Sequence, residues 1–400
     1  MSPTLDILVA GGGIGGLAAA YVLGREGHRV TVLEQSPAFG EIGAGIQLGP
    51  NIFRMFDYLG LTQAVNRVAY FPPGMGMNDV RTGEKVVRVP LAGVAQATYG
   101  YPYGLIYRAD LHDVFLDACK ALPTVTLLTS SKVEGFEQDA RSVRARLAGG
   151  DTLQADALIG ADGLWSRVRQ QVVGDGKPRV SGHIAYRAVL KREDVPAHLW
   201  NDDVVLWGGE KTHLVHYPLR RGELFNLVAV FHSNKYEEGW NTFGDTAELH
   251  ERFEHAVPQV KELLSKIETW KMWVLCDREP VKNWSDGRVT LLGDAAHPML
   301  QYLAQGAGQA IEDAVVLGEA LKATQGDAAQ AFLKYQQARY LRTGRVQLTA
   351  RFYGDIYHAA GVTRELRNQM FQSGKESAGF AGLKWMYDGI DPRNLFNSGA

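Results

Sequence analysis

Residues 6–34, DILVAGGGIGGLAAAYVLGREGHRVTVLE, are the stretch of this sequence that decides its fold. A short apolar run leads into a glycine-rich turn, an alanine-rich segment with helical character follows, and a second apolar run ends at Glu34. Near-continuous apolar strands on both sides of a helix are typical of a βαβ unit in a buried parallel sheet. The stretch therefore predicts the start of a nucleotide-binding α/β lobe.

Each glycine of the pattern Gly11-x-Gly13-x-x-Gly16 has its own physical role. Gly11 permits the tight turn, Gly13 lets the chain approach a pyrophosphate because it has no Cβ, and Gly16 lets helix and strand pack closely. Gly15 lies in the same turn, and the helix N-terminus presents free N–H groups to phosphate. Glu34 ends the second strand, where a carboxylate accepts hydrogen bonds from an adenosine ribose. The motif predicts a dinucleotide without distinguishing FAD from NAD.

A second motif, RVTLLGDAAHPMLQYLAQGAGQAIEDA at 288–314, favours FAD. A strand ends at Gly293-Asp294, and a helix begins near Gly306. Asp294 at a strand terminus can bond a ribityl hydroxyl of a flavin, and the N–H groups of the turn before the helix can stabilise negative charge on a reduced flavin.

Two further positions have both a cofactor-binding and a plain structural interpretation. Asp162 follows the run LIGA and precedes a short helix, so it is either a cofactor contact or a helix cap. Arg108 begins a predicted helix at 108–121, where it either reaches the pyrophosphate or is a solvated surface charge.

The residue composition of the chain changes at about residue 175. AYRAVL, THLVHYPL and LFNLVAVFH are rich in β-branched and aromatic residues and predict a largely antiparallel sheet. We expect an α/β fold, with a Rossmann-like FAD-binding lobe, an inserted, mainly antiparallel β substrate lobe and C-terminal helices. The predicted parts are an FAD lobe at 1–174 with a strand-rich segment at about 74–104, the β-rich lobe at 175–280, the rest of the FAD lobe at 281–355, and a helical segment at 356–400.

The composition excludes several classes of protein. A net charge of -2 over 400 residues gives no electrostatic reason to expect nucleic acid or an anionic membrane as partner. Two cysteines, Cys119 and Cys276, support neither a disulfide framework nor a metal site. Asp6 and the glycines interrupt the apolar N-terminus, which argues against a signal peptide, and no other apolar run is long enough to span a membrane. We expect a cytoplasmic protein.

Together these motifs carry a family resemblance. GGGIGG at 11–16, ADG with SRVR at 161–169 and the 293–314 stretch resemble the signatures of group A flavoprotein monooxygenases, which have the p-hydroxybenzoate hydroxylase-type fold. The resemblance covers about residues 5–350. It implies non-covalent FAD, reduction by NADH or NADPH, and a flavin C4a-hydroperoxide that hydroxylates an electron-rich ring. It also implies cofactor contacts at Gly45, Val133 and Ala307.

Within the family, the sequence is most similar to the 3-hydroxybenzoate 6-hydroxylases, which implies attack para to the hydroxyl and gentisate (2,5-dihydroxybenzoate) as product. Salicylate 1-hydroxylases and 6-hydroxynicotinate 3-monooxygenases share several stretches but tend to differ at Leu300-Gln301-Tyr302, and the latter also at Gln47. Both substrates stay open as alternatives. The stretches closest to the 3-hydroxybenzoate 6-hydroxylases are EIGAGIQLGPN at 41–51, YRADLH at 107–112, THLVHYPLRRGE at 212–223 and PMLQYLAQGA at 298–307.

The chemistry needs a base, because a phenol with a pKa near 10 is mostly neutral at pH 7 and its phenolate is far more reactive. His213 is the candidate base. His213 and Tyr217 share one strand face because side chains alternate with period two, and His216 points the opposite way. By resemblance, His213, Gln301 and Tyr217 activate and orient the substrate, and Tyr103 lines the cavity.

Two other classes of protein remain as alternatives. A pyridine-nucleotide dehydrogenase can carry the same glycine-rich fold, and a flavin-binding sensor would need neither base nor substrate pocket. Partners are expected to be a small aromatic acid, NAD(P)H and O2, and a homodimer is expected only because it is the commonest closed assembly.

Overall fold

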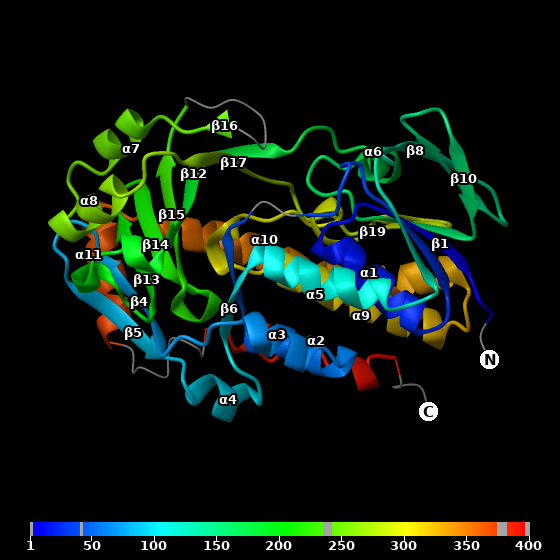
Figure 1. The fold of residues 1–400 in the computed structure, drawn as a ribbon, viewed down its shortest axis with the longest axis horizontal. Coiled ribbons are helices and arrows are strands. Elements are labelled where there is room, and N and C mark those ends of the chain that lie inside the picture. The colour runs from blue at the N-terminus through cyan, green and yellow to red at the C-terminus, as the bar shows by residue number, and fades with distance from the viewer. Residues whose placement is uncertain (1–2, 41–42, 235–241, 374–381, 397–400) are drawn as a thin grey trace.

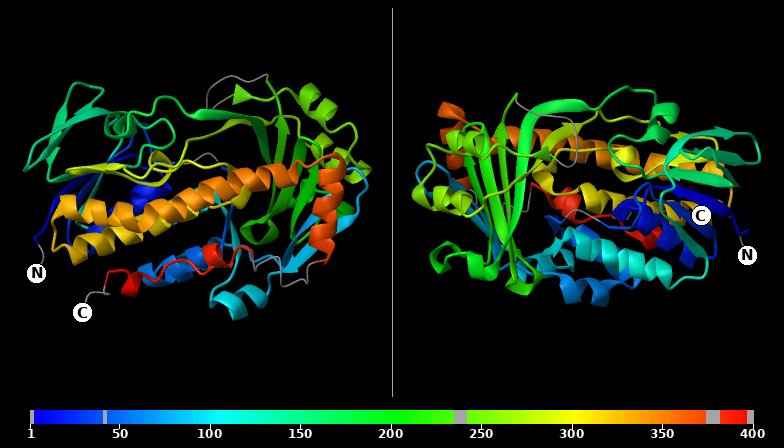
Figure 2. Two further views of the ribbon diagram at one scale, coloured as in Figure 1. Left: turned by 180° about the vertical axis from the view of Figure 1, so that it is seen from behind. Right: turned by 45° about the horizontal axis from the view of Figure 1, so that its top comes forward.

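The computed structural model describes residues 3–40, 43–234, 242–373 and 382–396, so Glu41 and Ile42 of the EIGAGIQLGPN stretch lie outside it. Two lobes lie side by side, and the long helix α10 runs from one to the other (Figures 1 and 2). The first lobe contains a mainly parallel sheet with helices, and the second contains a large, mostly antiparallel sheet.

The sheet of the first lobe has the order β18-β19-β11-β1-β2-β7. Its central strands pair in parallel. In β1 only the first residue is half-buried, and the other four are buried. This burial confirms the prediction that the apolar runs form a covered parallel sheet. The strands are β1 (Asp6–Ala10), β2 (Arg29–Leu33), β7 (Val125–Leu128), β11 (Ala157–Gly160), β18 (Ser285–Asp286) and β19 (Val289–Leu291).

Helices from distant parts of the sequence cover this sheet. α1 packs against both α5 and α9, and α9 packs against α10. Two helices, α2 and α3, follow one another at 50–68, because Gly60 has a left-handed φ of 74° and ends α2. The helices of this lobe are α1 (Ile14–Arg25), α2 (Pro50–Leu59), α3 (Thr62–Val68), α5 (Arg108–Lys120), α6 (Arg167–Val172), α9 (Gly306–Ala323) and α10 (Ala328–Tyr357).

The second sheet has the order β16-β17-β12-β15-β14-β13-β4-β5. It includes β4, which pairs in parallel with β13, and β5, which pairs antiparallel with β4 and forms the edge of the sheet. The strand-rich segment predicted inside the FAD lobe therefore contributes to the sheet of the β-rich lobe. The strands are β4 (Gly74–Asp79), β5 (Lys85–Pro90), β12 (Arg179–Lys191), β13 (Val204–Gly209), β14 (Thr212–Leu219), β15 (Leu224–His232), β16 (Thr242–Phe243) and β17 (Lys271–Asp277).

The remaining strands form two small sheets, one of three strands and one of two. α7 and α8 supply part of the apolar core on one side of the second sheet, where Phe253 and Leu263 are buried. Within the described ranges, none of the helices combines the length and apolar character that a membrane span requires. These elements are β3 (Gly45–Leu48), β6 (Gly104–Tyr107), β8 (Val133–Gln138), β9 (Val143–Leu147), β10 (Thr152–Ala155), α4 (Val94–Tyr99), α7 (Thr246–Arg252), α8 (Pro258–Ser265), α11 (Gly361–Ser373) and α13 (Lys384–Tyr387).

Candidate active site

A cavity of about 500 Å³ lies between the two lobes. At one end it is lined by residues that follow the parallel strands of the first sheet, including Gly13, Ala161 and Asp294. At the other end the wall is the second sheet, with His213 and Arg187 among its side chains. The carboxyl edge of a parallel sheet is where open α/β folds bind nucleotides, so the first end is the expected cofactor site.

The turn before α1 is built for close approach of a ligand. Gly11 has a φ of 107°, and a Cβ on Gly16 would lie 2.0 Å from the carbonyl oxygen of Gly11. Gly13 caps α1 in extended conformation and provides no side-chain hydrogen bond to the helix. The first N–H groups of α1 therefore have no side-chain cap, and this end of the cavity offers them to an anion such as a pyrophosphate.

A second helix opens into the same cavity. α9 begins at Gly306, no side chain caps it, and Gly306, Ala307 and Asp294 line the cavity. Gly45 and Arg108 line it as well. Two uncapped helix ends and one carboxylate along a single cavity match the phosphates, ribityl chain and ring system of FAD. The residues present fit that group.

Five residues predicted to bind the cofactor do not line the cavity. Gly11 lies in the turn, Gly16 packs against it from the first turn of α1, and Val133 is buried in β8. The Glu34 carboxylate accepts hydrogen bonds from the backbone N–H groups of Gly12 and Ser36, both at 2.8 Å. The Asp162 carboxylate accepts from the Ser166 hydroxyl at 2.5 Å and the Arg167 N–H at 2.7 Å, which is the helix-capping arrangement. Their roles toward the cofactor remain predictions.

At the end of the cavity against the second sheet, the lining residues follow the alternation of β14. His213, Val215 and Tyr217 all line the cavity. His216 lies on the opposite face, where its Nε2 accepts a hydrogen bond from the Trp207 indole at 3.0 Å. The placement expected from a two-residue period is therefore present, and the tertiary structure places His213 and Tyr217 in one pocket.

His213 is only 2% exposed, and its environment keeps it neutral. Its Nδ1 lies 2.7 Å from Nε2 of His358, the residue that ends α10. Burial, followed by the neighbouring imidazoles of His183 and His232, lowers the pKa of His213 to about 3. The Nδ1 contact leaves Nε2 of His213 as the ring nitrogen free to accept a proton from a ligand.

Arg187, on β12, is a functional candidate that sequence reasoning missed. Its Nη2 donates a hydrogen bond to Oε1 of Gln301, its Nε has no hydrogen-bond partner in the described structure, and it lines the cavity. Burial lowers the pKa of Arg187 to about 10. The signal available in the sequence was a single arginine inside the apolar run AYRAVL.

A glutamine links the two tyrosines of the pocket. The Tyr103 hydroxyl donates to Oε1 of Gln47 at 2.6 Å, and the Gln47 side chain also hydrogen-bonds the Tyr217 hydroxyl. Burial raises the pKa of both tyrosines, so both stay protonated. A Cβ on Gly45 would lie 2.6 Å from the Tyr217 ring, so glycine at this position makes room for that ring.

His297, which lies beside the flavin motif in the sequence, has a structural role. Its Nε2 lies 2.6 Å from the Asp313 carboxylate, and both side chains are buried. Asp313 in turn accepts from Arg339 at 2.6 Å. Through Asp313, His297 therefore ties the loop after β19 to α9 and α10.

A dinucleotide-binding lobe whose cavity continues into a pocket with a histidine, an amide and an arginine is typical of flavin-dependent oxidoreductases. The chain belongs to the FAD binding domain family, whose model matches residues 4–348. It is 46% identical to a 3-hydroxybenzoate 6-hydroxylase of Polaromonas naphthalenivorans (strain CJ2), over 96% of both chains.

Two solved structures share the fold. The salicylate hydroxylase substrate complex superposes with a TM-score of 0.83 at 26% identity, over 98% of this chain and 97% of that one. Klebsiella pneumoniae HpxO, solved with FAD and uric acid, has a TM-score of 0.84 at 27% identity, over 96% and 97%. The protein is an FAD-dependent aromatic monooxygenase.

Proposed function

We propose that the protein hydroxylates 3-hydroxybenzoate at carbon 6, the position para to the hydroxyl, and releases 2,5-dihydroxybenzoate, with NAD(P)H and O2 as co-substrates. The observation that carries the proposal is the convergence of His213, Gln301 and Arg187 on one end of the cavity. Identity of 46% to a 3-hydroxybenzoate 6-hydroxylase over nearly the whole chain supports this choice of ring.

The register of the second sheet sets the spacing between His213, the proposed base, and the positive charge of Arg187. Arg187 pairs with Val228, and Val228 pairs with Val215, so these three side chains form one row across three strands. His213 lies in the next row on the same face. Two strand spacings amount to about 10 Å between backbones, and the long Arg187 side chain shortens that gap. The proposal places a benzoate ring between them, with its hydroxyl at His213 and its carboxylate toward Arg187 and Tyr217.

Gln301 has a defined orientation because arginine has no acceptor. Arg187 can only donate, so the atom of Gln301 facing it is the carbonyl oxygen, and the side-chain NH2 is left for the ligand. An amide donor beside the substrate oxygen stabilises the phenolate and does not stabilise the neutral phenol to the same extent. Gln301 is therefore proposed to bind the anion that reacts.

Two electrostatic effects oppose each other at His213. A phenol has a pKa near 10 and His213 a pKa of about 3, so transferring the proton to an isolated His213 costs on the order of 10 kcal/mol. The Gln301 amide and the Arg187 charge lower this cost because they stabilise the phenolate in a buried site. When bound, FAD would pass electrons from NAD(P)H to O2 and deliver the hydroxylating oxygen, while these side chains orient the ring and hold its charge.

Product analysis tests the proposal. The FAD-loaded protein is mixed with NADH or NADPH and, in parallel, with 3-hydroxybenzoate, salicylate or 6-hydroxynicotinate, and products and hydrogen peroxide are quantified by chromatography. The expected result is 2,5-dihydroxybenzoate formed in proportion to the nicotinamide oxidised. Coupled product from salicylate or 6-hydroxynicotinate alone would overturn the choice of substrate, and oxidation of nicotinamide without O2 uptake would indicate a dehydrogenase.

A further inference from the structure

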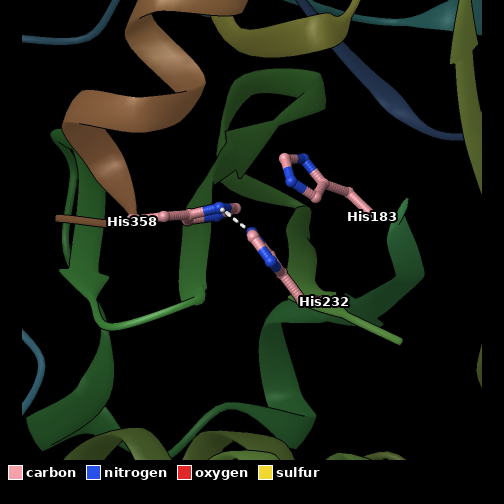
Figure 3. A group of neighbouring side chains, drawn as sticks. All are labelled: His183, His232 and His358. Carbon is pink, nitrogen blue, oxygen red and sulfur yellow. Dashed lines mark hydrogen bonds between the residues drawn. The ribbon is translucent and has the colours of Figure 1, made fainter. Parts of the chain in front are cut away.

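Four histidines cluster beside the cavity, and the strand pairing places three of them on the cavity face of the second sheet. His183, His213 and His232 belong to β12, β14 and β15, and His358 caps the C-terminus of α10. Nδ1 of His213 lies 2.7 Å from Nε2 of His358, and Nδ1 of His358 lies 3.0 Å from Nε2 of His232. Figure 3 shows the bond between His358 and His232, with the ring of His183 to one side. Three of the rings therefore form a continuous hydrogen-bonded chain.

Both ring nitrogens of His358 are engaged in this chain. A neutral imidazole has one donor and one acceptor nitrogen, so His358 must accept from one neighbour and donate to the other. Burial lowers the pKa of His358 and of His232, which keeps the rings neutral at rest. The chain has two arrangements of its protons, and conversion of one into the other moves one proton from end to end.

Each end of the chain opens into a different space. His213 lines the substrate cavity. His232 lines a second pocket of about 320 Å³, and His358 lines neither. The charged groups around His232 are Lys211 and Arg252, which lower its pKa, and Asp355, which raises it. Glu210, Glu251, Glu254 and His255 also line the second pocket.

A metal centre is the rival explanation of the cluster. Nitrogens of His183, His232 and His358 all lie within 4.8 Å of one another. Nδ1 of His183, however, lies 2.5 Å from the Tyr302 hydroxyl, and the His183 ring stacks on that of His232 at 4.0 Å between centroids. A zinc ion would need nitrogens converging on one point at about 2.0–2.1 Å. The hydrogen bond between His358 and His232 instead places a proton between two of the three candidate ligands.

We propose that the chain His213–His358–His232 carries the proton of the substrate hydroxyl from the cavity to the second pocket. This inference rests on the proposed role of His213 as base. The substrate O–H bond breaks and its proton binds Nε2 of His213, while the Nδ1 proton of His213 passes to Nε2 of His358. The Nδ1 proton of His358 passes to Nε2 of His232, which releases its other proton to water. The reverse transfer resets the rings when the product phenolate takes a proton back.

The relay is tested at its outer end, away from the substrate. The FAD-loaded full chain is mixed with 3-hydroxybenzoate in weak buffer, and stopped-flow absorbance follows the phenolate and a pH indicator. His232→Ala is expected to slow phenolate formation and proton release by about tenfold or more, while the Kd for the substrate stays within about twofold. Added imidazole is expected to restore the rate, because the second pocket is open to the solvent.

His255→Ala is the matched control, since His255 lines the same pocket but pairs only with exposed Glu254 among the described contacts. It is expected to behave like the wild type. His232→Gln, which keeps a hydrogen-bonding side chain, tests the relay if the alanine variant loses its FAD. Equal rates in wild type and His232→Gln would overturn the relay, as would stoichiometric zinc that disappears in the His232 variants.

Failure of the relay and failure of the proposed function give different results. If the wild type hydroxylates another of the three acids instead of 3-hydroxybenzoate, the proposed substrate is wrong, and the same indicator assay is run with that acid. If 2,5-dihydroxybenzoate forms but His232 variants release protons at the wild-type rate, only the relay is wrong.

Discussion

The Arg187 guanidinium donates a hydrogen bond to the side-chain oxygen of Gln301, and these residues are 114 positions apart in the chain. With the oxygen of Gln301 held by Arg187, its amide NH2 remains available to a ligand, and the half-buried guanidinium charge lies beside it. The described residues give Arg187 no carboxylate partner, and a charge withdrawn from water without one is costly. An anionic ligand in the cavity would supply that missing charge.

Arg187→Met tests this relationship. Hydrogen bonds to charged groups contribute about 1.5–3 kcal/mol, so the Kd and KM for the aromatic acid are expected to rise by about 10- to 100-fold. FAD binding is expected to persist, and titration of the flavin absorbance with substrate measures the Kd. Arg192→Met is the control, because Arg192 lies over Trp200 at 4.0 Å, outside the residues that line the cavity. Equal affinity in both variants would remove Arg187 from the site.

His213→Ala is expected to retain FAD and to lose hydroxylation by about 100-fold, within the range for general acid–base groups. Turnover is measured as product formed per nicotinamide oxidised. His216→Gln serves as control, since this residue lies on the same strand but faces Trp207 instead of the cavity. An unchanged hydroxylation rate in His213→Ala would reject its assignment as the base.

Gly45→Ala is expected to disturb the pocket by overpacking. The added Cβ would lie 2.6 Å from the Tyr217 ring and 2.8 Å from Cγ of Asn226. Overpacking of this kind costs about 1–3 kcal/mol, and displacement of Tyr217 weakens substrate binding. Gly40→Ala is the control, because nothing lies within 4 Å of its added Cβ. Thermal denaturation and substrate Kd are compared, and identical values in the two variants would contradict the packing argument.

Arg339→Met is expected to destabilise the fold by about 3–5 kcal/mol. Arg339 is fully buried and bonds Glu312 and Asp313, each at 2.6 Å, so its removal leaves two buried carboxylates without that partner. Denaturant unfolding measures the loss. Lys120→Met removes an exposed pair with Asp117 and is expected to change the free energy of unfolding by less than about 1 kcal/mol. A small effect in both variants would show that the buried network is dispensable.

The same network predicts an acid limit to stability. Burial opposes ionisation of Glu312, but the charges of Arg342 and Arg339 outweigh it and lower its pKa to about 2. A group whose pKa is lower in the folded state stabilises that state above its unfolded pKa of 4.5 and loses this contribution as pH falls toward 2. Unfolding free energies between pH 5 and 2.5 are expected to fall less steeply in Glu312→Gln than in the wild type. Parallel curves would contradict this.

Local sequence patterns were sufficient for much of the fold. The glycine turn at 11–16, the strand ending at Asp294 and the alternation through His213 and Tyr217 depend on steric limits and periods that operate within a few residues. The strand-rich segment predicted at about 74–104 contains β4 and β5, together with the short helix α4, but β4 and β5 pair into the sheet of the β-rich lobe. The pairing of β4 with β13 joins residues more than 100 positions apart, and no local pattern encodes that partner.

The site was predicted unevenly for the same reason. His213 could be nominated because its strand alternates and a family resemblance pointed to it. Arg187 and His358 could not, because their importance comes from what they touch: the Gln301 oxygen and the His213 ring. The sequence left the role of Asp162 open, because its context fits both a cofactor contact and a helix cap. In the structure its carboxylate accepts hydrogen bonds at the start of α6.

By itself, the sequence determined that this chain makes a glycine-rich turn for a dinucleotide and strands with two distinct faces, because backbone sterics and side-chain periodicity act locally. Only the tertiary structure decided which side chains meet in the cavity, which rings form a chain of hydrogen bonds, and which charges stay buried. Those properties depend on distances between residues remote in sequence, and packing of the two lobes sets those distances.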